Sequence, residues 1–241
     1  MDAAETKGSL YVVAIPIGHP DDITHRAIAT LQAVDAVICE AYREGSTLLK
    51  KLGIAKELLL LNEHNEEEAA QEILAQLRRG RRLAIVSDCG TPVFADPGHY
   101  LIRAATQAGI PVTPVPGASA LMAALSLCDF KVERFIFEGF LPRERGKRRQ
   151  HLRRLAGMHL PLVLMDAPYR LVDLLEDVGI VYGKEAWVIL ACDLTQPSER
   201  VFRGAAAAIL RQLDRQKAEF VLIVASGSGQ PECALDNRDG R

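Results

Sequence analysis

Apolar segments alternate strictly with helical patterns over the first half of the sequence. Short apolar runs rich in branched side chains predict strands at 10–15, 36–39, 58–61 and 83–86, and a further strand from Val112. Stretches that predict helices lie between them, at 23–34, 46–53, 65–80 and 99–109. Strands and helices in this order favour a mostly parallel sheet covered by helices, so the predicted fold class is α/β.

Two of these helices carry start or stop signals in the sequence. Ser46 is predicted to cap a brief helix that Gly53 ends. Asn65 has Glu68 three residues later, a pattern that predicts a capping box at the start of a longer helix.

A cluster of prolines at Pro111, Pro114 and Pro116 interrupts the alternation. The run Pro-Val-Pro-Gly is typical of a semi-rigid connector, so we place a domain boundary there. The predicted domains are an N-terminal α/β domain at 9–115, a C-terminal α/β domain at 116–228 and a polar tail at 229–241. Predicted strands of the second domain lie at 135–138, 162–165, 186–191 and 220–224, with a hairpin-like run at 199–204.

The composition is that of an ordinary globular chain. Apolar residues make up 49% of 241 residues and the net charge is −2, so any contact with nucleic acid needs a local basic patch. The N-terminal sequence has no export signal, and no apolar run is long enough to span a bilayer. The five cysteines are widely spaced without a C-x-x-C pair, which indicates reduced thiols and a cytoplasmic location.

The sequence VSDCGTPVFADPG, at 86–98, is the richest loop in the chain. It follows an apolar strand and precedes a helix, the place where ligands bind in open α/β sheets. Gly90 and Gly98 allow close approach of the backbone, and Asp88 and Asp96 could hold a cation or a ribose diol. The alternative is a long connection whose aspartates only stabilise turns.

Several other chemistries lack their sequence patterns. No G-x-G-x-x-G follows the first strand, which disfavours an ordinary dinucleotide fold. The six histidines include no pair at metal-ligand spacing on a helix, so we expect no metal site. His64 lies at a strand-to-helix junction, where stabilising a turn and contacting a substrate are both open.

A basic segment at 143–154 holds seven cations in twelve residues. A solvated helix face is the usual explanation of such a run. The segment also follows the predicted end of a strand, where its cations could contact phosphates. Both interpretations remain open from the residues alone.

Motifs in order along the first 225 or so residues resemble the tetrapyrrole methylase superfamily, and within it the small-subunit ribosomal RNA cytidine 2'-O-methyltransferases. The matching stretches are LYVVAIPIG (10–18), Glu40 with Arg43, EHNE (63–66), VSDCGTPVFADPG (86–98), PVPGASAL (114–121), RFIFEGFLPR (134–143), DAPYRL (166–171) and EFVLIV (219–224). The resemblance implies two α/β domains with S-adenosylmethionine bound in a cleft between them.

The resemblance also implies roles for individual residues. The cofactor-binding residues implied by the family motifs are Pro16, Asp88, Gly90, Thr91, Pro92, Ser119, Ala120 and Met165. Methyl transfer from a sulfonium needs no metal and no covalent nucleophile, but a 2'-hydroxyl benefits from a base. Glu40, His64 and Asp96 are the candidate catalytic residues, although the base need not be a side chain. The candidate RNA-binding residues are Arg43, Arg143, Arg145, Lys147, Arg148 and Arg149.

Departures from the family pattern lie on the substrate side. The chain reads EAYR at Glu40–Arg43 where those enzymes read E-D-T-R, and Ala218 replaces a glycine. Those enzymes generally continue past the last strand into a helical extension, which we expect this chain to lack. RNA of the small ribosomal subunit is therefore the favoured partner. A tetrapyrrole or other small molecule, or a cofactor-binding paralogue without turnover, is the alternative. The family further implies a homodimer.

Overall fold

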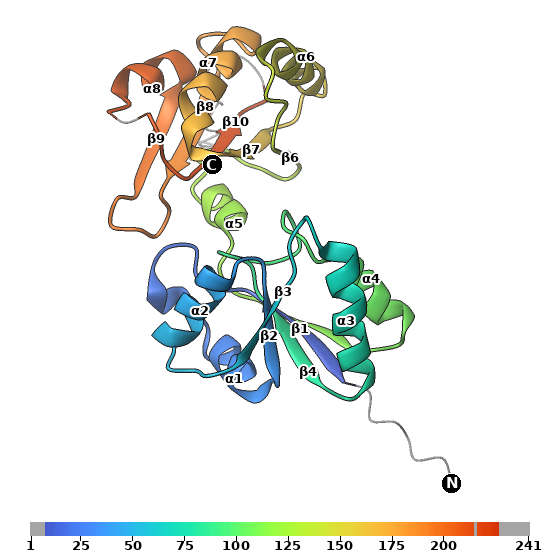
Figure 1. Cartoon of the computed structure of the whole chain (residues 1–241). Helices are drawn as coiled ribbons and strands as arrows, with labels where there is room; N and C mark the ends of the chain where they lie inside the picture. Colours follow the sequence, from blue (N-terminus) through green and yellow to red (C-terminus); the bar gives the residue numbers. More distant parts are fainter. Residues whose placement is uncertain (1–7, 215, 227–241) are drawn as a thin grey trace, which may run out of the picture. The chain divides into compact units, whose positions relative to one another are not determined.

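The computed structural model describes residues 8–214 and 216–226 and divides into two compact units, Met1–Ser119 and Ala120–Arg241. Each unit has its own sheet (Figure 1), and the buried apolar side chains of each form a separate hydrophobic core. The sequence places the domain boundary at 115/116. The tail predicted at 229–241, the end of the second domain at 228 and Cys233 lie outside the described residues.

The sheet of the first unit is parallel throughout, as the alternation of strands and helices predicts. Its strands are β1 (Ser9–Val13), β2 (Ala36–Cys39), β3 (Glu57–Leu60), β4 (Arg82–Ile85) and β5 (Val112–Val115). They are ordered β3-β2-β4-β1-β5. The central strands are apolar on both faces, because helices cover both.

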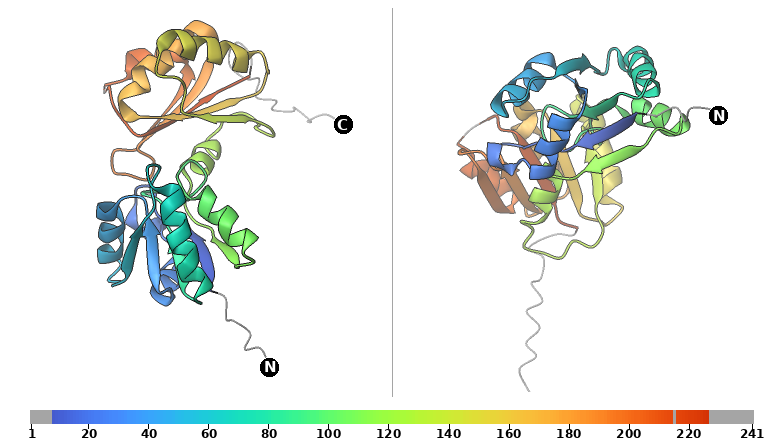
Figure 2. Two further views of the ribbon diagram at one scale, coloured as in Figure 1. Left: turned by 45° about the vertical axis from the view of Figure 1, so that its right-hand side comes forward. Right: turned by 90° about the horizontal axis from the view of Figure 1, so that it is seen from below.

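Helices cover the two faces of this sheet in pairs (Figures 1 and 2). The helices are α1 (His25–Ala33), α2 (Tyr42–Lys51), α3 (Glu66–Arg78) and α4 (His99–Gln107), with a 3-10 turn at Pro20–Asp22. Leu31 of α1 and Leu49 of α2 pack with Ala84 on one face. On the other face, Leu77 of α3 and Leu101 of α4 pack with neighbouring residues of the same strands, in agreement with the two-residue repeat of a strand.

Both predicted helix caps are wrong in detail. The second helix begins at Tyr42 after an extended Ala41, so Ser46 lies inside it rather than at its start. Asn65 does precede α3, but its side chain gives the helix no capping bond, because Asn65 Oδ1 accepts the N–H of Asn62 at 2.8 Å. The capping box is therefore absent. Gly53, at φ +66°, does follow the end of α2.

The second unit has a mixed sheet ordered β6-β7-β10-β8-β9. Its elements are α5 (Ala120–Leu125), β6 (Ile136–Gly139), α6 (Arg145–Ala156), β7 (Leu162–Asp166), a 3-10 turn (Pro168–Arg170), α7 (Leu171–Val181), β8 (Trp187–Cys192), β9 (Arg200–Ala205), α8 (Ala206–Gln212) and β10 (Phe220–Val224). Strands β6 and β7 are parallel, and the remaining pairs are antiparallel. Leu152 of α6, Leu174 of α7 and Ile209 of α8 share one core with the sheet.

None of the described helices has both the length and the apolar character needed to cross a membrane.

Candidate functional site

The topology of the first sheet places a crevice at the carboxyl end of β4. Strand β4 lies between β2 and β1, whose following helices α2 and α1 cover one face of the sheet. The chain leaves β4 toward α4 on the opposite face. Loops that leave neighbouring parallel strands in opposite directions open the crevice in which α/β proteins bind ligands. The loop at 86–98 is therefore located at the switch point of this sheet.

The loops after β1 and β4 are joined by backbone hydrogen bonds. Ile15 N–H donates to Gly90 O at 2.9 Å, and Gly90 N–H donates to Pro16 O at 3.4 Å. Gly90 has φ +74°, and a Cβ there would lie 3.1 Å from Cγ2 of Ile17. Only glycine meets both the positive φ and the close approach without strain. The structure thus brings Pro16 and Gly90 together, both predicted from the sequence to bind the cofactor.

The same loop is joined to the end of the first unit. The hydroxyl of Thr91 donates to Ala118 O at 3.1 Å. Gly117 passes so close to β1 that a Cβ there would lie 3.1 Å from Cβ of Ala14. The predicted residue Ser119 follows directly, and Pro92 is buried within the loop. Ala120 and Met165, the other predicted cofactor residues, belong to the second unit.

Three carboxyl groups near this edge have raised pKa values. The pKa of Glu40 is raised mainly by burial, and further by the negative charges of Asp88, Asp96 and Glu63. Burial and Asp88 likewise raise the pKa of Asp96. The pKa of Asp88 is raised by burial and by Glu44, against the lowering effect of the Ala41 N–H that it accepts.

Ion pairing does not account for the charge of these three groups among the described residues. Within the part of the chain that the structure describes, none of the three carboxylates takes part in an ion pair. No cluster of His, Cys, Asp and Glu suited to a metal ion is found among the same residues. The edge therefore has uncompensated negative charge, which suits an organic cation such as a sulfonium or an ammonium group.

A pocket of about 700 Å³ opens beside these loops within the first unit. Ile15, Ile23 and Leu48 form part of its apolar wall, while Arg43 and Lys51 of α2 and Asp88 give it both signs of charge. Pro16, Arg43 and Asp88 were all predicted site residues, and the fold brings them to one pocket. Lys51 was not predicted, because a lysine at the end of a helix is usual there and carries no distinguishing signal.

The EHNE motif divides into an exposed and a structural part. The side chain of His64 is 86% exposed, with Nε2 3.7 Å from the Glu63 carboxylate. Glu66 Oε1 accepts the N–H groups of Gly98 at 2.9 Å and Tyr100 at 3.1 Å, at the start of α4. A carboxylate there satisfies donors that a helix start leaves unpaired. Sequence reasoning missed this role, and the signal for it is Gly98, which has no side chain to cap α4.

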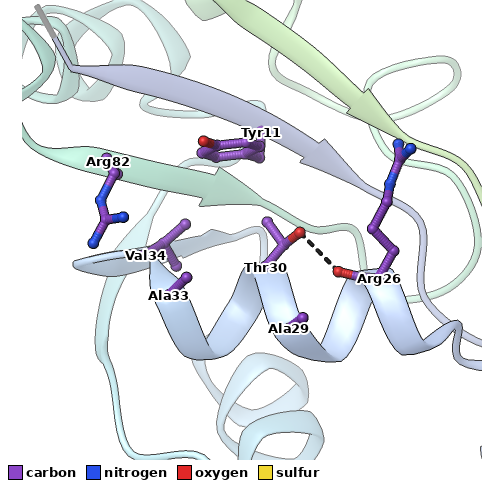
Figure 3. Close-up of a pocket in the computed structure, with 7 residues that line it drawn as sticks. All are labelled: Tyr11, Arg26, Ala29, Thr30, Ala33, Val34 and Arg82. Carbon is purple, nitrogen blue, oxygen red and sulfur yellow. Dashed lines mark hydrogen bonds between the residues drawn. The ribbon is translucent and has the colours of Figure 1, made fainter.

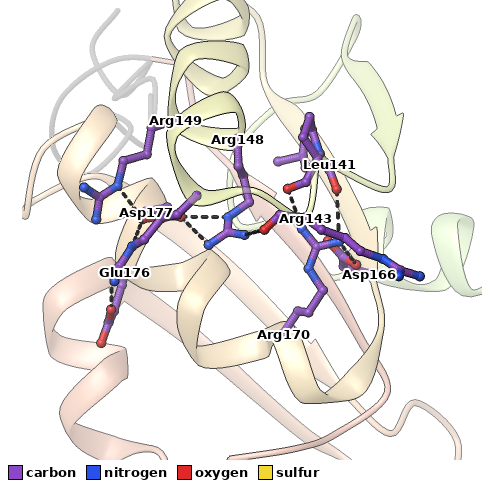
Figure 4. A network of polar contacts seen from close by, with 10 residues as sticks. Leu141, Arg143, Arg148, Arg149, Asp166, Arg170, Glu176 and Asp177 are labelled. Atoms are coloured by element: carbon purple, nitrogen blue, oxygen red, sulfur yellow. Dashed lines mark hydrogen bonds and ion pairs between the residues drawn. The ribbon is translucent and has the colours of Figure 1, made fainter.

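The basic segment forms α6, and three of its arginines converge on one carboxylate of α7 (Figure 4). Asp177 is fully buried and accepts Nε of Arg145 at 3.1 Å, of Arg148 at 2.7 Å and of Arg149 at 2.6 Å. Burial alone raises the pKa of Asp177, but hydrogen bonds from these arginines lower it below its ordinary value. This acceptor was not predictable from the sequence, because Asp177 lies far along the chain in a helix whose other buried residues are apolar.

This network corrects the prediction for Arg148. Its side chain is 4% exposed, its charge is paired with Asp177, and it cannot contact RNA from the surface. Arg145 and Arg149 also pair with Asp177 but remain 49% and 28% exposed. Arg143 and Lys147 are exposed. The basic segment is thus partly structural and partly exposed, and its exposed Lys147 is paired with Glu144 at 2.8 Å.

A second, smaller pocket of about 210 Å³ lies between α1 and the sheet of the first unit (Figure 3). Tyr11, Thr30 and Arg82 are among its lining residues, and Arg26 there donates to the carbonyl of Pro114. No predicted site residue lines it. We therefore assign the candidate site to the loops at the carboxyl edge.

Comparison with known proteins was made on sequence and on structure. The family of tetrapyrrole (corrin/porphyrin) methylases matches residues 9–210. The ribosomal RNA small subunit methyltransferase I of Escherichia coli O157:H7 is 39% identical over 234 residues, covering 95% of this chain and 82% of that protein. Its counterpart in Xylella fastidiosa (strain Temecula1) is 41% identical over 229 residues, covering 93% and 84%.

A solved structure with the same fold contains a methyltransferase product. The uroporphyrin-III C-methyltransferase of Thermus thermophilus, complexed with S-adenosylhomocysteine, superimposes with a TM-score of 0.65 at 18% identity. The match covers 90% of this chain and 97% of that one. This likeness supports the two-domain α/β fold that the sequence predicts.

Proposed function

The chain belongs to the tetrapyrrole methylase family, and we propose that it methylates the 2'-oxygen of a cytidine in small-subunit ribosomal RNA. It is a methyltransferase, and S-adenosylmethionine is its methyl donor. The proposal for the substrate rests on one observation: relatives about 40% identical over more than 90% of this chain are named for ribosomal RNA of the small subunit. The cytidine and its 2'-oxygen come from the motif resemblance.

We propose that the joined loops of the first unit hold the cofactor. Pro16, Asp88, Gly90, Thr91, Pro92 and Ser119 would line it, and the family motifs add Ala120 and Met165. Two features support a fit. Gly90 leaves open the space that a Cβ would fill, so backbone groups can approach a ligand. The uncompensated carboxylates near Asp88 would balance the positive charge of a sulfonium and an ammonium.

Bound S-adenosylmethionine supplies an electrophilic methyl group, and the residues of the chain would align the acceptor and remove its proton. We propose Glu40 or Asp96 as the base, because burial and neighbouring charge raise both pKa values toward the working pH. His64 remains a candidate, although its exposed position on a turn favours a role in contacting substrate. Arg43, Arg143, Lys147 and the exposed faces of Arg145 and Arg149 would contact RNA phosphates.

The test is transfer of labelled methyl from S-adenosylmethionine to small ribosomal subunits that lack 2'-O-methylcytidine. Label recovered in ribosomal RNA, at a cytidine 2'-oxygen, is expected. Bound cofactor without labelled RNA would overturn the proposal. The same assay with tetrapyrroles and with other RNAs would then identify the acceptor, or its absence in a cofactor-binding paralogue.

The cofactor site has a separate test in Thr91→Arg. Thr91 is exposed on the loop, so a larger side chain there should leave the fold intact while occupying the space of the ligand. We expect calorimetry to detect no binding of S-adenosylhomocysteine, with an unchanged circular dichroism spectrum. Thr113→Arg, on the exposed face of β5, is the matched control and should bind normally. Unaltered affinity in Thr91→Arg would refute this placement of the cofactor.

Two further expectations accompany the proposed substrate. Action on ribosomal RNA implies a cytoplasmic location, and the family resemblance implies a homodimer. Light scattering on the purified protein would measure its mass in solution, and a monomeric mass would exclude the dimer.

A further inference from the structure

Two large aromatic side chains of the second unit are exposed at the ends of neighbouring parallel strands. Phe140 follows β6 and is 67% exposed, and Tyr169 follows β7 and is 58% exposed. An exposed aromatic ring contributes no hydrophobic free energy to folding, because its apolar faces stay in water. Tyr42 and Phe94 of the first unit are similarly exposed, but Phe140 and Tyr169 follow neighbouring strands, so together they are a candidate binding surface.

Buried arginines hold the segment after β6 in place. Arg170, from the turn that carries Tyr169, donates to Leu141 O at 3.0 Å and to Pro142 O at 2.9 Å. Arg148 donates to Arg143 O at 3.0 Å. Three successive carbonyl oxygens are thus fixed by two guanidinium groups, which are themselves paired with Asp166 and Asp177 (Figure 4).

This arrangement orders a loop without using its side chains. The bonds to Leu141, Pro142 and Arg143 all involve backbone oxygens, so the side chains of Phe140 and Arg143 are left exposed. The Arg170 bonds also fix the Tyr169 turn beside this loop. A rigid loop that presents a ring and a cation next to a second ring loses little entropy on binding.

From this geometry we propose that Phe140, Arg143 and Tyr169 form a nucleotide-recognition surface, on which the two rings stack with unpaired RNA bases and Arg143 contacts a phosphate. The proposal rests on the proposed function, since it assigns the RNA-contacting side chains of the same enzyme. Aromatic rings beside cations are the means by which proteins bind single-stranded nucleic acid. Arg143 and the exposed Arg153 of the adjoining α6 give the surface cations of the kind that RNA requires, whereas the exposed Lys147 is paired with Glu144 at 2.8 Å.

The experiment measures affinity for naked small-subunit ribosomal RNA over a series of salt concentrations. Phe140→Ala and Tyr169→Ala are each expected to weaken binding about 5-fold to about 100-fold, with an unchanged salt slope, because stacking carries no counterion release. Arg143→Ala is expected to weaken binding and to reduce the slope by about 0.7, the value for one phosphate contact on a single strand. Phe140→Trp should restore binding, whereas Phe140→Leu should not.

Matched controls come from the same unit. Met158→Ala removes an exposed apolar side chain, 51% exposed, and should leave RNA affinity unchanged. All variants should retain wild-type affinity for S-adenosylhomocysteine and the wild-type unfolding transition, which excludes misfolding as the cause.

The outcomes separate this inference from the proposed function. Wild-type methylation of ribosomal RNA together with unchanged RNA affinity in the Phe140→Ala and Tyr169→Ala variants would overturn the recognition surface and leave the proposed function standing. Normal binding of naked RNA with weakened binding of the intact small subunit would assign the surface to a ribosomal protein, which also overturns the inference. A wild-type protein that neither binds nor methylates ribosomal RNA would overturn both.

Discussion

Carboxylates in the two units stand in opposite electrostatic surroundings. Burial raises the pKa values of Glu40, Asp88 and Asp96 at the carboxyl edge of the first sheet, the charge of Asp88 raises those of the other two further, and none of the three is paired with a cation in the described chain. Asp177 of the second unit is more deeply buried, yet three arginines lower its pKa. The chain thus compensates the buried charge of Asp177 within its own structure, whereas under the proposed placement of the cofactor the charge at the first sheet would be neutralised by the ligand.

The largest expected effect on stability comes from removing the charge of Asp177, which the arginines compensate. Asp177→Asn would leave the buried guanidinium of Arg148 without its counter-charge, at a cost of about 3 kcal/mol or more in the free energy of unfolding. Trp187 is the single tryptophan of the chain and belongs to the second unit, so its fluorescence during urea unfolding reports the loss.

The control for this change is Glu176→Gln, one residue away. Among the described residues Glu176 pairs with Arg145 alone, and both side chains are more than 40% exposed, so the loss should stay below about 1 kcal/mol. Equal losses in the two variants would show that burial of the pair does not decide the cost. The stability of the second unit would then not depend on pairing the buried charge of Asp177.

Glu66 of the first unit is a carboxylate whose charge is balanced by backbone N–H groups rather than by arginines. Glu66 lies near the same edge but is compensated by the N–H groups of Gly98 and Tyr100. Glu66→Ala should cost about 1 kcal/mol, as for the loss of a helix cap, and Glu66→Gln should retain most of the stability because its amide oxygen still accepts. Glu67→Ala, on the exposed side of α3, is the control, and urea unfolding followed by circular dichroism is the measurement. A loss in Glu67→Ala as large as that in Glu66→Ala would contradict the capping role.

Most of the fold could be predicted from local patterns in the sequence. The order of the strands in the chain, their apolar runs and the glycines that end helices all act over a few residues, so the elements were predictable. The parallel sheet followed because strands joined by helices have few other arrangements. The loop at 86–98 could be proposed as a ligand site because its glycines and aspartates are adjacent in sequence, and that role stays a prediction.

Long-range pairing was not predictable in the same way. Asp177 lies about 30 residues beyond the arginines that it binds, in a helix whose other inward residues are apolar, and no local rule connects them. For the same reason Arg148 was assigned to the surface with its neighbours, although helix α6 turns it into the core. The capping role of Glu66 also depends on a contact between segments, 32 residues apart, which only the fold creates.

The smallest expected effect on stability comes from removing the charge of Asp96, which has no paired cation among the described residues, and this change is expected to stabilise the protein. Burial and Asp88 raise the pKa of Asp96 above its ordinary value of 3.8, so its ionised form disfavours folding at neutral pH. Asp96→Asn removes this charge and should stabilise the protein by about 0.5 kcal/mol at pH 7.5. The gain should fall as the pH drops through the raised pKa, because the wild-type carboxyl then takes up a proton and loses its penalty.

The pH dependence of Asp177 runs the other way, since its lowered pKa means that its stabilising effect is present at neutral pH and is lost only in acid. Two measurements on Asp96→Asn test the role of Asp96. They are urea unfolding at pH 7.5 and at pH 4.5, and calorimetry of S-adenosylhomocysteine binding at pH 7.5. A more stable variant with weaker cofactor binding means that Asp96 serves a cationic ligand at the expense of the fold. A variant that loses stability and binds the cofactor normally means that Asp96 stabilises a turn, which is the alternative that the loop sequence left open.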